Sequence, residues 1–334
     1  MKPLRLLIGF LAVLVVLALI VGAGVLYVIL PTNAGKQTLE VKPGMSIGTI
    51  ATQLEQQGLI RNAAAFRLIA QYVGTDRRIR EGYYDLSGTQ NALELARTLG
   101  KLGRPRQITI AIPEGWRMSE IIARIAATNL VSNAELETAL RQTDLLEYTK
   151  GAISLEGFLF PATYQFRPED TANAIVKTMT SRFAKEVTAS RLATLELQKL
   201  SVYQWVTLAS IVQTEAGNAA EMPMIAGVFL NRLELGMALQ SDPTIAYGLG
   251  KRLPELSRRA GDFESKSPYN TYKLRGLTPT PISNPGAQAL QAVLNAQRRN
   301  SEGRQWLYFL HGKKGEFRPN TNFADHQRDN AAFR

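Results

Sequence analysis

The 334-residue chain contains no cysteine and only two histidines, His311 and His326. Without thiols it cannot form disulfides, thiolate zinc sites, iron–sulfur clusters or a cysteine nucleophile. Neither histidine lies in a metal-binding spacing such as H-E-x-x-H, and we expect no metal or other cofactor. Any catalysis by this chain must therefore depend mainly on carboxylates and hydroxyls.

The chain is rich in neither glycine nor proline, and its charge is unbalanced. The 26 glycines and 15 prolines exclude a collagen-like or fully disordered chain. The net charge of +11 raises the possibility of nucleic-acid binding, but the basic residues are spread among acidic ones and form no dense block with aromatics. We expect no nucleic-acid partner and interpret the charge as a solvated surface facing an anionic membrane or wall.

Residues 6–30 carry no charge, and this stretch exceeds the ~20 residues that cross a bilayer. Because Lys2 and Arg5 precede it, the positive-inside rule predicts a cytoplasmic tail at 1–5, a transmembrane helix at 6–30 and the remaining chain outside. A cleaved signal peptide is the alternative, since residues 21–23 are small enough for cleavage. The apolar run, however, is longer than the ~7–15 residues of a signal core. We expect a single-pass inner-membrane protein with its body in the periplasm.

Residues 36–150 contain an internal repeat at a constant offset of 71 residues. In each copy a short alternating strand precedes a glycine turn, a helix with apolar residues three and four apart, and an Asn-initiated segment. Matching pairs include Gly44 and Gly115, Leu54 and Ile125, Leu59 and Leu130, and Asn62 and Asn133. We expect two small α/β units, which either bind a polysaccharide or space the following domain from the membrane.

One carboxylate has an unusual position. The apolar periodicity predicts a helix from Val202 to a stop at Gly217, with Glu215 on the same buried stripe as Leu208. Burial against apolar side chains and the negative end of the helix dipole both raise the pKa of a carboxyl group, as a general acid near neutral pH requires. The alternatives are a Glu215 turned to solvent or paired with Arg232.

The sixty residues after Glu215 are dense in amides, hydroxyls and tyrosines. We expect a capping box at Asn218 and Glu221, a helix that follows it to Gly236, and a turn at Asp242. Sugars present many hydroxyls and apolar C–H faces, so this composition favours a sugar site. The candidate substrate-binding residues are Asn231, Gln240, Ser241, Asp242, Tyr269 and Asn270.

The chain resembles the YceG-like family, the MltG type of endolytic murein transglycosylase. The resemblance lies in LASIVQTEAG, VFLNRLELGMALQSDPTIAYG, SPYNTY, GLTPTPISNPG and SLEGFLFPATYQF. It covers essentially the whole chain and is most specific from Leu155 to His326. It implies an α+β protein with a LysM-like region, which we place at 36–150, and a catalytic domain at 151–334. It also implies that Glu215 is the catalytic residue.

The family cuts the β-1,4 bond between N-acetylmuramic acid and N-acetylglucosamine inside nascent peptidoglycan strands. The resemblance therefore implies nascent glycan strands and the peptidoglycan synthases (penicillin-binding proteins) as partners. The chain departs from common family residues at three places: Gln213 replaces an acidic residue, Ala162 replaces Asp, and residues 278–281 read Thr-Pro-Thr-Pro.

Two other functions stay open from the sequence. A muramidase would place a second carboxylate, such as Asp242, opposite Glu215. A non-catalytic wall-binding scaffold would depend on the repeats instead. Glu156, in SLEGFLFP, is a further carboxylate that either serves the site or braces the fold.

Overall fold

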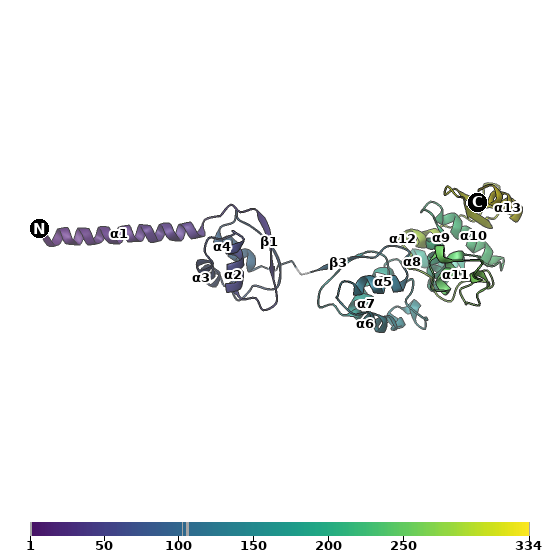
Figure 1. Ribbon diagram of the computed structural model, residues 1–334, viewed down its shortest axis with the longest axis horizontal. Helices are drawn as coiled ribbons and strands as arrows, with labels where there is room; N and C mark the ends of the chain where they lie inside the picture. The colour runs from purple at the N-terminus through teal and green to yellow at the C-terminus, as the bar shows by residue number, and fades with distance from the viewer. Residues whose placement is uncertain (1, 102, 105–106, 334) are drawn as a thin grey trace. The chain divides into compact units, whose positions relative to one another are not determined.

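The computed structural model describes residues 2–101, 103–104 and 107–333. It divides into two compact units, Met1–Gln107 and Ile108–Arg334 (Figure 1). The chain combines many helices with three short antiparallel strand pairs among the described residues, which confirms the expected α+β class. We describe each unit by itself.

The first unit contains a strand–helix–helix–strand module followed by a further helix. Its elements are β1 (Lys36–Val41), α2 (Ile47–Gln56), α3 (Ala63–Val73), β2 (Gly82–Ser87) and α4 (Ala92–Leu99). β1 and β2 pair antiparallel, with Lys36 opposite Ser87. Gly44 precedes α2 with φ +76°, a conformation that favours glycine. Alternate strand residues such as Leu39 pack against Leu54 and other helix residues in a fully buried core.

The second unit begins with the same module. Its elements are β3 (Ile108–Ala111), α5 (Met118–Ala126), α6 (Asn133–Leu140) and β4 (Thr163–Phe166). β3 and β4 pair antiparallel, with Ile108 opposite Phe166, and Gly115 has φ +77° in the turn before α5. The strand, glycine turn and helix that the repeat predicts are therefore confirmed in both copies, and each copy then closes with a second strand.

The second copy extends further along the chain than we expected. Its closing strand β4 lies beyond residue 150, after the 3₁₀ turns η1 (Thr143–Leu145) and η2 (Glu147–Thr149). One core cluster joins Leu136 to Leu159 and Ile175 across that position. The two compact units meet at residues 107 and 108, and the second contains β3 together with its hydrogen-bonding partner β4.

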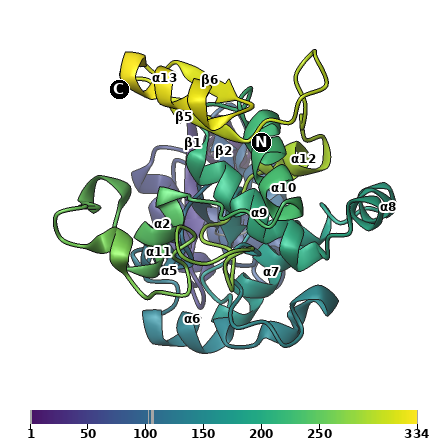
Figure 2. The same ribbon diagram turned by 90° about the vertical axis from the view of Figure 1, so that its right-hand side faces the viewer.

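A helical body follows β4 in the second unit. Its helices are α7 (Ala172–Ala184), α8 (Ala189–Gln198), α9 (Val202–Glu215), α10 (Met222–Glu234), α11 (Asp242–Gly248) and α12 (Ala287–Leu294). Helix α9, whose residues from Trp205 to Val212 are all buried, packs against α10, α11 and α12 (Figure 2). Short 3₁₀ turns η3 (Leu253–Glu255) and η4 (Asp262–Glu264) interrupt the long segment between α11 and α12.

The chain ends in a hairpin and a helix, coloured yellow in Figure 2. β5 (Tyr308–His311) pairs antiparallel with β6 (Phe317–Asn320), and α13 (Phe323–Phe333) packs on both strands. β5 also contacts α10, so this hairpin is joined to the helical body. Phe309 on β5 makes an edge-to-face contact with Phe229 on α10, with ring centroids 5.8 Å apart.

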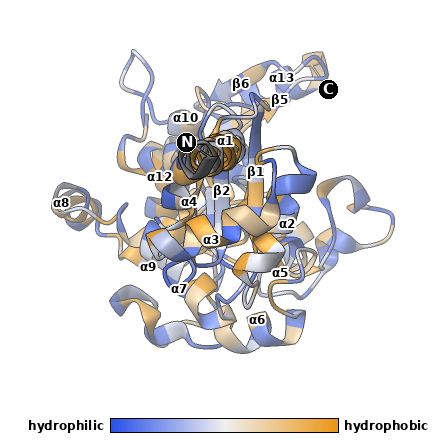
Figure 3. Ribbon diagram, turned by 90° about the vertical axis from the view of Figure 1, so that its left-hand side faces the viewer, coloured by the Kyte–Doolittle hydropathy of each residue, from blue (hydrophilic) through white to orange (hydrophobic). Residues whose placement is uncertain are grey.

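The amino-terminal helix α1 (Lys2–Ile29) belongs to the first unit. Its segment Gly9–Ile29 has a mean hydropathy of 2.9 and is not buried inside the protein, and its turns include the orange hydrophobic residues of Figure 3. The carboxyl-terminal end of the helix is held by Arg61, whose guanidinium donates to the carbonyls of Tyr27 and Leu30 at 2.9 and 2.6 Å. This length and composition fit a membrane-spanning helix.

Candidate active site

Glu215 is the last residue of the largely apolar helix α9. Ser201 and Gln204 form a capping box at the start of α9, and Trp205 donates from Nε1 to the carbonyl of Leu290 at 2.8 Å. The predicted start of the helix is confirmed, but α9 ends at Glu215, before Gly217, because Ala216 is extended.

Glu215 lies at a cavity wall and not within the apolar core. Leu208 and Val212 on α9 are fully buried as expected, whereas Glu215 is half-buried. It lines a cavity of about 470 Å³, which we call the Glu215 cavity, together with polar residues that include Arg232 and Tyr272. The prediction of a Glu215 buried against apolar side chains is therefore corrected: one turn beyond Val212, the helix face opens onto this polar cavity.

Arg232 provides a fixed positive charge in the Glu215 cavity. Its guanidinium donates to the carbonyls of Leu307 and Leu239 at 2.7 and 2.8 Å and to Gln240 Oε1 at 3.2 Å. Burial lowers the pKa of Arg232, while the electrostatic influence of Glu215 and neighbouring tyrosines acts in the opposite direction. The guanidinium is thus held in place by backbone oxygens and interacts electrostatically with the Glu215 carboxylate.

Asp242 and Tyr272 form a second polar group in the Glu215 cavity. Tyr272 donates its hydroxyl hydrogen to Asp242 Oδ1 at 2.6 Å. Burial raises the pKa of Tyr272, so the phenol stays protonated as a donor near neutral pH. The expected turn at Asp242 is wrong: Asp242 is the first residue of α11, where Pro243 is tolerated because the first helical N–H groups need no partner.

Three of the predicted substrate-binding residues are fully buried. Asn231 donates to the carbonyls of Arg298 and Trp306 at 2.7 and 2.8 Å, and Asn270 donates to two carbonyls of its own loop at 3.0 and 2.9 Å. Ser241 precedes α11 and has 0% exposure. Of the six predicted residues, the structure brings Gln240 and Asp242 into the Glu215 cavity and buries these three inside the fold.

Tyr269, the sixth, lies with a separate buried group. Its hydroxyl is 2.9 Å from Thr280 Oγ1, and its ring packs against Tyr247 with centroids 5.0 Å apart. Tyr247 in turn donates to Glu156 Oε2 at 3.1 Å. Tyr269 therefore lies outside the residues that line the Glu215 cavity.

Glu156 braces the second repeat copy against the helical body. It is 2% exposed, and its Oε1 accepts hydrogen bonds from the Met118 amide at 2.8 Å and from Asn284 at 2.9 Å. Burial raises the pKa of Glu156 to about 7, against the hydrogen bonds from Met118, Tyr247 and Asn284 and the charge of Arg117. Of the two roles left open for Glu156, this position fits the brace.

His311 and Glu221 form a polar pair that the sequence did not indicate. His311 Nε2 lies 2.9 Å from Glu221 Oε2, which also accepts from the Gly217 amide at 2.9 Å. The expected capping box at Asn218 is replaced by an Asn218 side-chain bond to Glu221 Oε1 at 2.6 Å. Burial opposes ionisation of Glu221, but the bonds from His311, Gly217 and Asn218 together lower its pKa. The pair fixes the chain just after Glu215, and His311 lines the Glu215 cavity.

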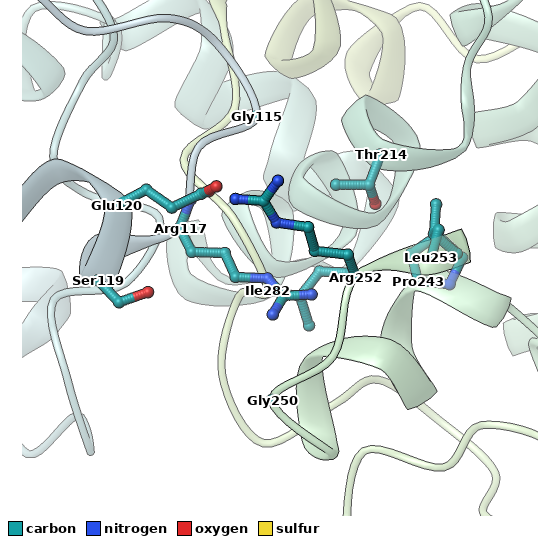
Figure 4. Close-up of a pocket in the computed structure, with 10 residues that line it drawn as sticks. All are labelled: Gly115, Arg117, Ser119, Glu120, Thr214, Pro243, Gly250, Arg252, Leu253 and Ile282. Atoms are coloured by element: carbon teal, nitrogen blue, oxygen red, sulfur yellow. The ribbon is translucent and has the colours of Figure 1, made fainter. Parts of the chain in front are cut away.

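A second cavity of about 420 Å³ adjoins the first. Thr214, Pro243 and Leu253 line both cavities, and Arg117 and Arg252 line only the second, which we call the arginine pocket (Figure 4). Because Thr214 precedes Glu215 at the carboxyl-terminal end of α9, the two cavities meet beside this end of the helix. Among the described residues no cluster of three His, Asp or Glu side chains is arranged to hold a metal ion.

These features define the class of protein: an α+β protein with a glutamate at the wall of a polar cavity, without a metal cluster among the described residues. The chain belongs to the YceG-like family, whose model matches residues 39–332. It is 31% identical to the "endolytic murein transglycosylase" of Bacillus subtilis (strain 168), over 93% of this chain and 90% of that protein. The resemblance that the sequence motifs indicate is thereby confirmed.

Two further similarities agree with this membership. The protein of the same name from Streptococcus pneumoniae serotype 2 (strain D39 / NCTC 7466) is 30% identical over 95% of this chain, which spans 63% of that protein's length. A crystal structure of a yceG-like protein from Listeria monocytogenes superimposes with a TM-score of 0.58 at 31% identity. The match covers 88% of this chain and 99% of that one.

Proposed function

We propose that this protein is an endolytic murein transglycosylase, a lyase that cuts glycan strands internally, and that Glu215 is its catalytic acid and base. The observation that carries the proposal is the position of Glu215, which ends the rigid helix α9 at a polar cavity shared with Arg232 and Asp242. Membership of the YceG-like family supports the same activity.

The reaction needs one carboxyl group. Protonated Glu215 donates its proton to the glycosidic oxygen, the bond from that oxygen to C1 of the muramic sugar breaks, and an oxocarbenium-like state develops. The 6-hydroxyl of the same sugar then attacks C1 and returns its proton to Glu215, which leaves a 1,6-anhydro end. No water is consumed, and the attacking hydroxyl is already tethered, so little orientation entropy remains to be lost.

The neighbours of Glu215 have roles that follow from their positions. The positive charge of Arg232 stabilises the Glu215 carboxylate that exists between the two proton transfers. Gln240 and Asp242 present polar groups to sugar hydroxyls, and Tyr272 orients Asp242. A hydrolase would need a second carboxylate to activate water or act as a nucleophile.

The adjoining cavities suit cleavage within a strand. A glycan that binds in the Glu215 cavity can continue past Thr214, Pro243 and Leu253, where this cavity meets the arginine pocket. A site that trimmed strands from one end would need to be closed on one side. This arrangement therefore favours endolytic cleavage.

We propose a position in the cell that is supported by α1. Arg61 caps the carbonyls at the end of α1 and lies 4.6 Å from the Tyr27 ring, so the helix is built into the first unit, which favours a retained anchor over a cleaved signal. The N-terminus is cytoplasmic and the body lies in the periplasm, at the membrane where synthases extend nascent strands. The two strand–helix–helix–strand modules are LysM-like and hold or space the glycan.

The test is digestion of purified peptidoglycan by the full-length protein in detergent, with products identified by mass spectrometry. We expect internally cut, anhydro-ended fragments from the wild type and none from Glu215→Gln. Glu169→Gln is the matched control, since Glu169 is exposed. Reducing-ended products that disappear in Asp242→Asn would instead identify a muramidase. Equal products from wild type and Glu215→Gln would exclude Glu215 as the acid.

A further inference from the structure

The arginine pocket has a wall from the second repeat copy. Arg117 precedes α5, and its Nη2 donates to the carbonyl of Lys251 at 2.7 Å while its guanidinium lies 5.4 Å from the Tyr247 ring centroid. These contacts hold the side chain in one orientation and use one of its N–H donors. The remaining donors have no partner among the described residues, and the guanidinium is available to a ligand.

Arg252 supplies the opposite wall. Its guanidinium makes no hydrogen bond or ion pair within the part of the chain that the structure describes, and Figure 4 shows both arginine side chains directed into the pocket. The one acidic side chain that lines the pocket, Glu120, accepts a hydrogen bond from the Arg117 amide at 2.9 Å. Two guanidinium groups against one carboxylate leave the pocket positively charged.

Such a pocket selects an anion with a planar, forked geometry. Guanidinium groups bind carboxylates through paired N–H donors, which fixes orientation as well as charge. The sugars of murein are neutral apart from what is attached to them. The carboxylates belong to the stem peptides, which are joined to the lactyl group of the muramic sugars.

The pocket also lies where such a peptide would reach. It shares Thr214 with the Glu215 cavity, and Thr214 is adjacent in sequence to the catalytic acid. A muramic sugar next to the bond being cut therefore has its peptide beside Arg117 and Arg252. A cavity of about 420 Å³ lies within the range of small-ligand sites and accommodates part of a peptide.

We propose that the arginine pocket is a subsite for the carboxylates of a stem peptide, so that the enzyme selects strand positions that carry peptides. This inference rests on the proposed function. The second repeat copy thus forms part of the substrate site through Arg117, in addition to any role as a spacer.

The test measures binding in the full-length Glu215→Gln protein in detergent, where cleavage plays no part. Calorimetry compares three ligands: glycan fragments that carry uncrosslinked stem peptides, the same fragments with the peptide carboxyls amidated, and fragments whose peptides have been removed and whose freed lactyl carboxyls have been amidated. The variants are Arg252→Gln, Arg252→Lys and, as the matched control, Arg141→Gln, because Arg141 is exposed and lines neither cavity.

We expect the Glu215→Gln protein, the parent of these variants, to bind the peptide-bearing ligand more tightly than either of the other two. Arg252→Gln should reduce that preference about fivefold, the upper range for a solvent-exposed ion pair, and Arg252→Lys should retain part of it. Arg141→Gln should leave the preference unchanged. Equal affinity of the parent for all three ligands, or an equal loss for all three ligands in Arg252→Gln, would overturn the subsite. The proposed function is tested separately by the digestion of peptidoglycan, and it would be overturned if the wild-type protein yields no anhydro-ended product.

Discussion

Replacing Glu156 with glutamine tests how the buried Glu156 carboxyl group, which hydrogen-bonds to the second repeat copy, contributes to stability. Glutamine is nearly the same size, and its oxygen can accept the bonds that Met118 and Asn284 give to Glu156 Oε1, at 2.8 and 2.9 Å. Its amide group can donate to the hydroxyl of Tyr247, which now donates to Glu156 Oε2. The substitution therefore removes the titration and keeps the packing.

The magnitude follows from the pKa of Glu156, which burial raises from 4.5 to about 7. The folded protein binds this proton more tightly than the unfolded chain does, so the stabilisation is complete below pH 4.5 and is lost as the pH rises to about 7. A pKa difference of this size corresponds to about 3 kcal/mol. Relative to wild type, the free energy of unfolding of Glu156→Gln should thus rise by about 3 kcal/mol across this interval.

Thermal unfolding of the full-length protein in detergent, from pH 4.5 to 8, measures this difference. For a unit as large as Ile108–Arg334, about 3 kcal/mol corresponds to a relative gain in Tm of roughly 6–12 °C. Glu169→Gln is the control, because Glu169 is exposed, and its curve should stay parallel to wild type. Parallel curves for Glu156→Gln and wild type would show that Glu156 is already ionised in the folded protein at low pH, and would refute the reasoning.

Three further substitutions distinguish packing from chemistry. Gly227→Ala should destabilise the protein by roughly 3 kcal/mol in denaturant titrations, because a Cβ there would overlap the carbonyl oxygen of Gln297; an unchanged midpoint would contradict this contact. Asn231→Ala should cost about 3 kcal/mol of stability while kcat/KM of the folded protein stays near wild type, and a loss of activity at full stability would restore a role in the cleft. His311→Ala should lower kcat about tenfold with little change in KM, because the bond to Glu221 fixes the chain just after Glu215, the proposed catalytic acid; equal kcat values would remove that role.

The helix that carries Glu215 was predictable, because a long apolar periodicity signals a buried helix with little ambiguity. The surroundings of Glu215 were not predictable from the sequence. The half-exposed position of Glu215 depends on Arg232 from α10 and Tyr272 from a distant loop, neither of which local periodicity can place. His311 lies 90 residues from Glu221, so no local pattern in the sequence links them.

The buried amides show a second limit of sequence reasoning. Asn231 and Asn270 occur among the polar residues that a sugar site needs, yet each donates to backbone carbonyls inside the fold. An amide suits both tasks equally, since it carries donors and an acceptor for either a hydroxyl or a peptide group. Composition therefore identified a region rich in hydrogen-bonding groups. Only the fold separates Gln240 and Asp242, which line the cavity, from the amides that hold its walls.

The two repeat copies illustrate how one module can serve two tasks. The first closes its sheet soon after α3, when β2 pairs with β1, and it remains within the unit Met1–Gln107. In the second copy, β3 pairs with β4, which lies much further along the chain. The chain between them includes Glu156, whose carboxylate accepts a hydrogen bond from the amide of Met118 at the start of α5. Because Asn284 binds the same carboxylate, the start of α5 is fixed relative to the helical body. The added segment thus makes the second repeat copy one wall of the arginine pocket, which Arg117 lines.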